Sequence, residues 1–398
     1  MWIRVHRTII VERCIIRPFW HGLARARWRR NYSTNTTLEA LPKALIDLSG
    51  KYHENREALM IWRTWARNIA YKTMHEFKGS DQPALSNLYT EIDWLIEDNV
   101  DAINGHSLNS KTEFINGTNM YASSDASDVL LRLSLSEMEA LWVQRLQSRT
   151  PIQYLTNFVY WRDLSLLVTP AVLIPRPETE LLIDFASSAY KNFPLTSETE
   201  RSDGGQMCLR RGPWLDLGTG SGALAIAFAQ VLLQNSENVR GLGKDDSNVF
   251  VYAVDVSPEA CVVAAHNVHR HNLDHIVQVM TSSWFDAVDS LQFSGIISNP
   301  PYIPSDLICS LQQEVRDHEP ILALDGGFKD GARSLIEICD GAATHLLKGG
   351  FFALETHGIE QAELIETLLR SMKCFTEIQI RSDYGGVKRF VTATKCSD

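Results

Sequence analysis

Apolar residues recur at helical spacing through much of residues 38–150. The segments that show this spacing most clearly are 41–48, 58–70 and 92–96. Farther along, Ser134-Leu-Ser-Glu137 matches a capping box, in which the serine and the glutamate each bond the other's backbone N–H at the start of a helix. The pattern predicts a small α-helical bundle, interrupted by a surface loop rich in Asn, Ser, Gly and Thr at residues 103–128.

Strand-like alternation replaces the helical pattern beyond residue 150. Phe158 and Tyr160 belong to one short alternating run, and Leu164 and Leu166 belong to a second. Two such runs close together are typical of a β-hairpin. We therefore assign residues 151–180 to a linker built around this hairpin.

From Trp214 to the end of the chain, short apolar runs alternate with amphipathic segments. The predicted strands are Trp214–Leu217, Val249–Val254, Ile276–Met280, Gly295–Ser298, Phe351–Glu355, Thr376–Arg381 and Lys388–Thr394. The predicted helices are Ala223–Leu233, Pro258–Asn272, Gly331–Leu347 and Ile359–Met372. This alternation predicts an α/β, Rossmann-like domain over residues 181–398, with a mostly parallel seven-stranded sheet covered on both faces.

Two further features of this domain follow from its polar residues. The last two predicted strands flank the turn signal Ser382-Asp-Tyr-Gly-Gly386, so we expect them to pair antiparallel at one edge of the sheet. Polar insertions at residues 196–212 and 234–248 are expected to be surface loops.

A glycine-rich loop, Asp216-Leu-Gly-Thr-Gly-Ser-Gly222, follows the first strand of this domain. Its glycines let the backbone approach a ligand closely at the start of a helix. The pattern also satisfies the relaxed dinucleotide fingerprint, so a nicotinamide cofactor is an open alternative. Asp216 suits the ammonium group of S-adenosylmethionine, whereas it would repel a pyrophosphate. Asp255, at the end of the second strand, suits the ribose hydroxyls of either cofactor, and the two acids together favour S-adenosylmethionine.

Asn299-Pro-Pro-Tyr302 directly follows an apolar run, Phe293–Ser298. Such a turn fits a planar NH2 group, because the Asn299 side-chain carbonyl and the Pro300 backbone carbonyl each accept a hydrogen bond from it. The prolines keep the loop from relaxing, and Tyr302 offers a flat face on which an amide stacks. The motif predicts methyl transfer to an amide or amino nitrogen, with Asn299, Pro300 and Tyr302 as catalytic residues. A rigid strand exit is the purely structural alternative.

Charge is unevenly distributed along the 398 residues, whose formal net charge is −10. Residues 1–37 contain eight arginines, no lysine and one acid, and the remainder carries 30 basic and 47 acidic side chains, a net −17. A basic, acid-poor start with interleaved apolar residues is typical of a mitochondrial targeting segment, and an arm that binds nucleic acid is the alternative. Seven scattered cysteines without C-x-x-C spacing favour reduced thiols in a matrix-like compartment, and no metal site is expected.

Taken together, these motifs resemble the release-factor glutamine N5-methyltransferases, the HemK/PrmC-like family. The segments that carry the resemblance are Pro151–Tyr154, Leu173–Glu180, Asp216–Ala223, Val254–Ser257, Ser283–Phe285, Asn299–Ile303 and Glu319–Gly327. The resemblance implies a class I S-adenosylmethionine-dependent methyltransferase fold. It also implies that the substrate is the glutamine in the Gly-Gly-Gln loop of a class I peptide chain release factor.

The resemblance further implies roles for individual residues. S-adenosylmethionine is expected to contact Asp216, Gly218, Thr219, Gly220, Ser221, Gly222, Asp255, Trp284 and Asn299. The substrate glutamine is expected to contact Asn299, Pro300, Pro301 and Tyr302. The helical region 38–150 is expected to engage the release factor. The targeting segment makes the mitochondrial release factor the expected partner in the matrix, with no stable nucleic-acid partner and no membrane span.

Three positions depart from the family pattern or repeat its substrate. His318 stands where an aromatic residue is expected before Glu-Pro, and Leu354-Glu-Thr-His-Gly358 is one residue longer than the family's stretch. Gly204-Gly205-Gln206, inside one insertion, is the tripeptide that the family methylates. A loop of this composition produces such a triplet easily, and self-methylation or pseudosubstrate inhibition is the functional alternative.

Three other functions are compatible with part of the sequence. A nucleic-acid adenine amino-methyltransferase would need a basic groove, which a net charge of −17 beyond residue 37 does not favour. A sibling that modifies a ribosomal-protein glutamine carries P-R-S where this chain has Pro177. A non-catalytic assembly factor would have no need of the intact Asn299–Tyr302 and Gly218–Gly222 motifs.

Overall fold

The computed structural model describes residues 41–76, 81–103, 106–107, 128–193, 212–235 and 250–397. The predicted targeting segment 1–37, the tripeptide Gly204-Gly205-Gln206 and most of the three polar insertions lie outside these ranges. The described residues from Pro42 onward belong to one compact unit. None of the described helices is both long enough and apolar enough to cross a bilayer.

Helices dominate the described residues before position 150, as predicted. They are α2 (Arg56–Glu76), α3 (Leu85–Asn99) and α5 (Leu135–Ser148), and α2 packs against the other two. The predicted capping box opens α5, because the Ser134 hydroxyl accepts from the Glu137 backbone N–H at 3.2 Å and the Glu137 carboxylate accepts from the Ser134 N–H at 2.8 Å. The segment 41–48 forms only one short 3-10 turn, Leu45–Asp47.

A small antiparallel sheet accompanies these helices and was not predicted. Its strands are β1 (Tyr52–Asn55), β2 (Val100–Ile103), β3 (His106–Ser107) and β4 (Asp128–Leu131), in the order β1-β4-β2-β3. Strands of two to four residues are too short to show alternation. The pairing of β1 with β4 also joins segments far apart in the chain, which periodicity does not reveal.

The predicted hairpin is confirmed in the linker. Strands β5 (Phe158–Trp161) and β6 (Leu164–Leu167) pair antiparallel, and they follow a short helix α6 (Ile152–Thr156) that was not predicted. The Asn267 amide fixes the hairpin to the larger domain, since it donates to the Leu167 carbonyl at 2.9 Å and to the Ser221 carbonyl at 2.8 Å. The linker is thereby attached to the glycine-rich loop that contains Ser221.

The seven-stranded, mostly parallel sheet of the second half is confirmed, in the order β14-β15-β13-β10-β7-β8-β9. The strands are β7 (Trp214–Leu217), β8 (Val251–Asp255), β9 (Val277–Thr281), β10 (Phe293–Ser298), β13 (Leu346–Glu355), β14 (Phe375–Ser382) and β15 (Lys388–Lys395). Strands β9, β8, β7, β10 and β13 are parallel to one another. The last two pair antiparallel at the edge, as the turn signal between them predicted.

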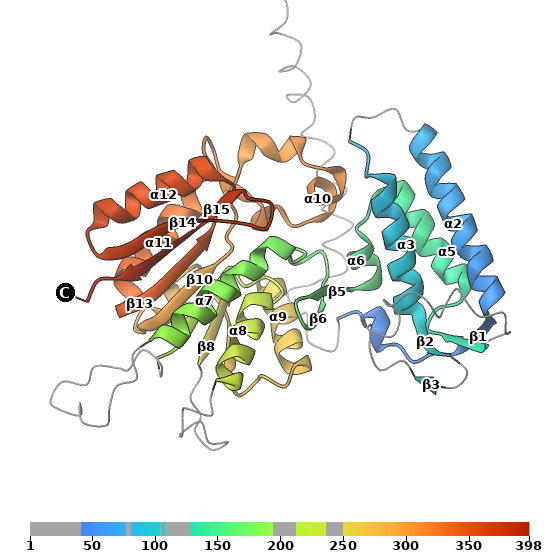
Figure 1. Ribbon diagram of the computed structural model, residues 1–398, viewed down its shortest axis with the longest axis horizontal. Coiled ribbons are helices and arrows are strands. Elements are labelled where there is room, and N and C mark those ends of the chain that lie inside the picture. The colour runs from blue at the N-terminus through green and yellow to red at the C-terminus, as the bar shows by residue number, and fades with distance from the viewer. Residues whose placement is uncertain are drawn as a thin grey trace, which may run out of the picture. The chain divides into compact units, whose positions relative to one another are not determined.

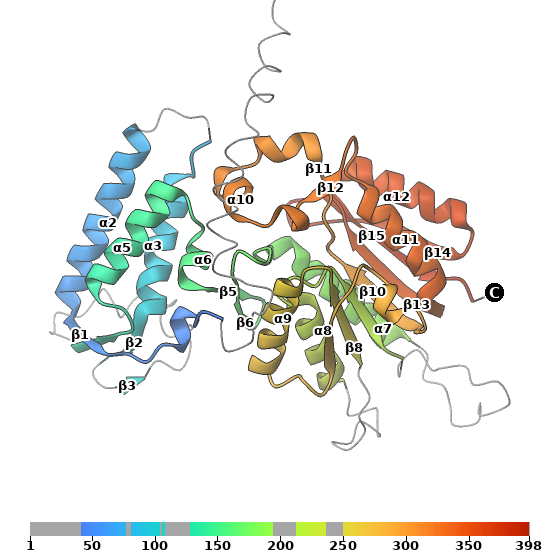
Figure 2. The ribbon, with the colours of Figure 1, turned by 180° about the vertical axis from the view of Figure 1, so that it is seen from behind.

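Helices cover both faces of this sheet (Figures 1 and 2). Helices α7 (Glu180–Asn192), α8 (Ala223–Gln234) and α9 (Pro258–Arg270) share one apolar cluster with the sheet, and α11 (Arg333–His345) and α12 (Ile359–Met372) share another. Helices α7, α9, α11 and α12 each turn an apolar stripe toward the sheet, whereas the first two turns of α8 are buried on all sides. Together the helices bury both faces of the sheet. Of these helices, α7 was not predicted.

The carboxyl ends of four parallel strands meet at one edge of the sheet. Strand β7 leads into the glycine-rich loop, β8 ends at Asp255, β10 ends one residue before Asn299, and β13 ends at Glu355. Ligands of open parallel sheets bind at this edge. The predicted cofactor loop, acid and tetrapeptide are therefore brought together by the strand order.

Candidate active site

The glycine-rich loop adopts a backbone that favours glycine. Gly218, Gly220 and Gly222 have φ angles of 71°, 53° and 84°. At Gly220 an added Cβ would meet no atom within 4 Å, so the constraint is conformational and the space above the residue is open. The loop thus presents bare backbone to a ligand.

Asp216 supports this loop from beneath. Its Oδ2 atom accepts from the Thr219 hydroxyl at 2.6 Å and from the Ala225 backbone N–H at 3.1 Å. The side chain is fully buried and does not line the cavity described below. Asp216 therefore lies beneath the loop that it organises and outside the cavity wall, and its contact with a ligand ammonium stays a prediction.

Burial raises the pKa of Asp216 to about 7, against an ordinary value of 3.8. Its Oδ1 atom has no hydrogen-bond partner within the described residues, which deprives the charged form of compensation. Because the folded pKa lies above the unfolded one, the contribution of Asp216 to stability is complete below about pH 4 and is lost as the pH rises through 7.

Asp216→Asn is therefore expected to reduce the loss of stability of the cofactor-free protein between about pH 4 and 7. At about 1.4 kcal/mol per pKa unit, the shift corresponds to several kcal/mol of unfolding free energy. Urea unfolding of the wild type and the variant across this range measures the effect. Equal pH slopes for the two proteins would contradict it.

Asp255 lies on the other side of the same loop. Its Oδ2 atom accepts from the Gly220 N–H at 2.9 Å, and its Oδ1 atom accepts from the Ser257 N–H at 2.9 Å. Burial raises the pKa of this carboxyl, while the two backbone donors favour its charged form. A carboxylate oxygen has lone pairs to spare after one such bond, so both oxygens keep acceptor capacity for ligand hydroxyls.

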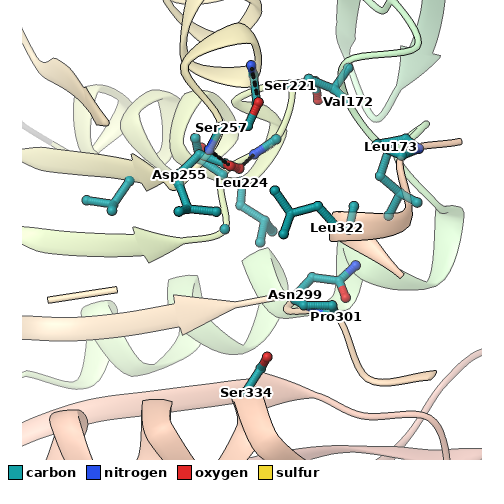
Figure 3. A pocket seen from close by; sticks show the side chains of 18 of the residues that line it. Val172, Leu173, Ser221, Leu224, Asp255, Ser257, Asn299, Pro301, Leu322 and Ser334 are labelled. Atoms are coloured by element: carbon teal, nitrogen blue, oxygen red, sulfur yellow. Dashed lines mark hydrogen bonds between the residues drawn. The ribbon is translucent and has the colours of Figure 1, made fainter. Parts of the chain in front are cut away.

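A cavity of about 360 Å³ opens between the loop, Asp255 and the tetrapeptide (Figure 3). The predicted residues that line it are Gly218, Thr219, Gly220, Ser221, Asp255, Trp284, Asn299 and Pro301. The predicted residues that do not are Asp216, Gly222, Pro300 and Tyr302. The volume falls within the range of small-ligand sites. Bare loop backbone, a strand-end carboxylate and an indole wall together fit a nucleoside cofactor.

Trp284 supplies the aromatic wall of the cavity. Its backbone has a φ of 41°, unusual for a bulky residue, and its indole N–H donates to the Glu337 carboxylate at 2.7 Å. The ring also lies 3.9 Å from the position of a Cβ added at Gly218. The hydrogen bond to α11 therefore holds the ring next to the glycine-rich loop.

The tetrapeptide is tied to two side chains that the sequence analysis did not assign. Asn299 Nδ2 donates to the Thr179 hydroxyl at 2.9 Å, and that hydroxyl donates to Glu355 Oε2 at 2.8 Å. The Tyr302 hydroxyl donates to the second oxygen, Glu355 Oε1, at 3.0 Å. Burial raises the pKa of Tyr302 and raises that of Glu355 to about 7.

Some of the other cavity residues missed by the sequence analysis are polar, namely Ser282, Arg333, Ser334 and Glu337, and others are apolar. Leu173 and Pro175 come from the linker, and Leu322 and Ala323 from the segment after Glu319. Both segments were noted as resembling family blocks, but aliphatic side chains carry no chemical signature by which to assign a site. His318, which departs from the family pattern, lies outside the cavity and meets the Ser148 carbonyl at 2.8 Å through Nε2.

Comparisons with known proteins agree with this geometry. Residues 206–308, which contain both the glycine-rich loop and the tetrapeptide, match the family described as Methyltransferase small domain. A release factor glutamine methyltransferase of Thermosynechococcus vestitus is 36% identical over 265 residues, which cover 66% of this chain and 80% of that protein. The one of Gloeobacter violaceus is 38% identical over 255 residues, which cover 64% and 78%.

Solved structures are more distant. The ribosomal protein L11 methylase of Lactobacillus delbrueckii subsp. bulgaricus is 18% identical, with a TM-score of 0.34, and covers 56% of this chain and 80% of its own. A likeness of that degree adds nothing to the sequence relationship, which spans most of the length of the bacterial enzymes. The chain belongs to the release factor glutamine methyltransferase family and is an S-adenosylmethionine-dependent protein-glutamine methyltransferase of the class I fold.

Proposed function

We propose that this enzyme methylates the N5 nitrogen of the glutamine in the Gly-Gly-Gln motif of a mitochondrial class I release factor and so supports translation termination. The observation that carries the proposal is the Asn299 amide, which lines the cofactor cavity while its NH2 group is already bonded to Thr179. The bacterial relatives named above are release factor glutamine methyltransferases, which supports the choice of substrate.

The chemistry requires orientation more than a base. An amide nitrogen is a poor nucleophile, because its lone pair is delocalised into the carbonyl. Asn299 Oδ1, and in the proposed complex the Pro300 carbonyl, accept the two N–H bonds of the substrate and leave one face of its nitrogen free. S-adenosylmethionine supplies an electrophilic methyl group when bound. The substrate nitrogen then releases a proton after transfer, so no strong general base is needed.

The mitochondrial part of the proposal rests on composition. Residues 1–37 combine eight arginines and one acid with interleaved apolar residues, which is typical of a targeting segment. We propose that the enzyme acts in the matrix and that the region 38–150 engages the release factor. A fusion of residues 1–37 to a fluorescent protein is expected to enter mitochondria, and diffuse fluorescence would contradict the proposed location.

Mass spectrometry of the mitochondrial release factor tests the substrate. In cells that lack this enzyme, the peptide with the Gly-Gly-Gln motif is expected to lose the mass of one methyl group, and the intact gene should restore it. A peptide methylated to the same extent in both cell lines would contradict the proposal. Loss of methyl groups from ribosomal-protein glutamine or from adenine instead would favour one of the alternative substrates.

A further inference from the structure

The pairing of strands β10 and β13 places Glu355 next to the catalytic tetrapeptide, and Thr179 connects the two by hydrogen bonds. Strands β10 and β13 are parallel neighbours in which Ser298 pairs with Leu354, so the next residues, Asn299 and Glu355, lie side by side at the carboxyl end of the sheet. Thr179, at the start of α7, bridges them with bonds of 2.9 Å to Asn299 and 2.8 Å to Glu355. Three elements thus meet in one chain of hydrogen bonds.

The Thr179 hydroxyl does not cap helix α7, although Thr179 occupies the N-cap position. The residue directly precedes α7, where a threonine commonly caps the helix with its side chain. Here it makes no capping bond, and the hydroxyl lies between Asn299 and Glu355 instead. Thr179 and Glu355 are both buried, which makes each polar bond in this chain matter.

The chain of bonds has a direction. A carboxylate only accepts hydrogen bonds, so the hydroxyls of Thr179 and Tyr302 both donate to Glu355. Thr179 then has only lone pairs left to offer Asn299, and these suit the NH2 end of the amide. The carbonyl oxygen of Asn299 is consequently the end left free.

We propose that Thr179 and Glu355 are positioning residues that fix the direction of the Asn299 amide, so that its carbonyl oxygen meets the substrate NH2 group. The inference rests on the proposed function, because this direction is productive only for a substrate that donates N–H bonds. If the Asn299 amide were reversed, its NH2 group would face the NH2 group of the substrate, and the substrate would lose one of its two hydrogen-bond acceptors.

Protonation of Glu355 removes the constraint that orients the Asn299 amide, because the carboxyl group no longer only accepts hydrogen bonds. A protonated carboxyl donates to Thr179, which can then donate in turn to Asn299 Oδ1 and accept the reversed amide. Burial raises the pKa of Glu355 to about 7. The productive direction is therefore expected above pH 7 and is lost as the pH falls through that value.

Some of the charged and titratable groups around Glu355 favour its carboxylate form, and others favour its protonated form. Arg389 of β15, which pairs with Asp383, favours the carboxylate, as do the two hydroxyl donors. Glu178, next to Thr179, disfavours it. The ring centroids of His357 and Tyr302 lie 6.2 Å apart. Arg176, paired with Glu319, opposes the rise in the pKa of Tyr302 that burial causes. Burial outweighs these effects in the raised pKa of Glu355.

Thr179→Val tests the proposal, because it keeps the shape of the side chain and removes the hydroxyl. At saturating cofactor and substrate, kcat is expected to fall about 100-fold, and the decline of kcat below pH 7 is expected to disappear. Thr179→Ser restores the hydroxyl, so it is expected to recover kcat to within about fivefold of wild type together with the pH dependence. A merely structural role would change kcat without changing the shape of the pH profile.

Thr392→Val is the matched control. Thr392 is buried like Thr179, but its hydroxyl accepts from Arg381 on the edge hairpin and does not line the cavity. This variant is expected to keep the wild-type pH profile of kcat. Melting temperatures of all variants, measured by calorimetry, separate loss of folded protein from loss of positioning.

A spectroscopic readout tests the inference without methyl transfer. In protein labelled with ¹⁵N-asparagine, the side-chain NH2 signal of Asn299, assigned by its absence in Asn299→Ala, is expected to shift as the pH crosses 7 in wild type but not in Thr179→Val. An unshifted wild-type signal, or a Thr179→Val enzyme with wild-type kcat and pH profile, would overturn the positioning role. If the signal shifts as expected but the release factor takes up no methyl group, the proposed function fails and the positioning role stands.

Discussion

Asn299→Ala is expected to lower kcat for glutamine methylation by about 100- to 1,000-fold while the protein remains folded. The substitution removes the side-chain acceptor that orients the substrate nitrogen, and it leaves one substrate N–H without a partner in the cavity. Single-turnover assays at saturating cofactor measure the effect on the transfer step itself.

The control for this variant is Asn192→Ala, at the exposed end of α7, which makes the same chemical change away from the cavity. It is expected to have wild-type kcat. An Asn299→Ala enzyme that retained kcat within about threefold of wild type, with an unchanged melting temperature, would show that the amide does not orient the substrate.

Asp255→Ala is expected to weaken S-adenosylmethionine binding about 100-fold, which corresponds to about 3 kcal/mol. The carboxylate provides acceptors for the ribose hydroxyls, and it also holds the Gly220 N–H at 2.9 Å. Its loss removes a charged hydrogen-bond acceptor and loosens the loop in one step. Isothermal titration of the cofactor into each protein measures the dissociation constant.

Asp274→Ala serves as the comparison, since Asp274 is exposed after α9 and pairs only with His269 among the ion pairs of the described residues. Its dissociation constant is expected to match that of wild type. If Asp255→Ala bound the cofactor within about threefold of wild type, the assignment of the ribose end of the cavity to Asp255 would be wrong.

The catalytic half of the fold was predictable because its local signals agree with one another. The predicted strand Trp214–Leu217 and helix Ile359–Met372 match the structure residue for residue. Buried parallel strands read as short apolar runs, and the glycines and Ser257 mark where helices begin. Helix α7 was missed although its apolar residues recur at helical spacing, with Leu182, Ile183, Ala186 and Tyr190 buried.

The cavity was only partly predictable. A sequence motif identifies residues with reactive or hydrogen-bonding groups, but it does not show which distant residues lie next to them in the fold. Asn299 and Asp255 carry recognisable groups at the ends of strands, and both line the cavity. Glu355 looked like the end of a strand, and nothing in the sequence shows that β13 lies beside β10 with Leu354 opposite Ser298. The small sheet β1-β4-β2-β3 was not predicted for the same reason, because its strand pairs join short segments that are far apart in the sequence.

Methyl transfer from labelled S-adenosylmethionine to purified mitochondrial release factor tests the central claim most directly. The experiment compares the natural Gly-Gly-Gln loop with a version in which the glutamine is alanine, each with wild-type enzyme and with Asn299→Ala. Label on the natural loop alone, with wild-type enzyme alone, is the predicted result. Equal labelling of both loops, or no labelling of the release factor by an enzyme that binds cofactor, would contradict the claim.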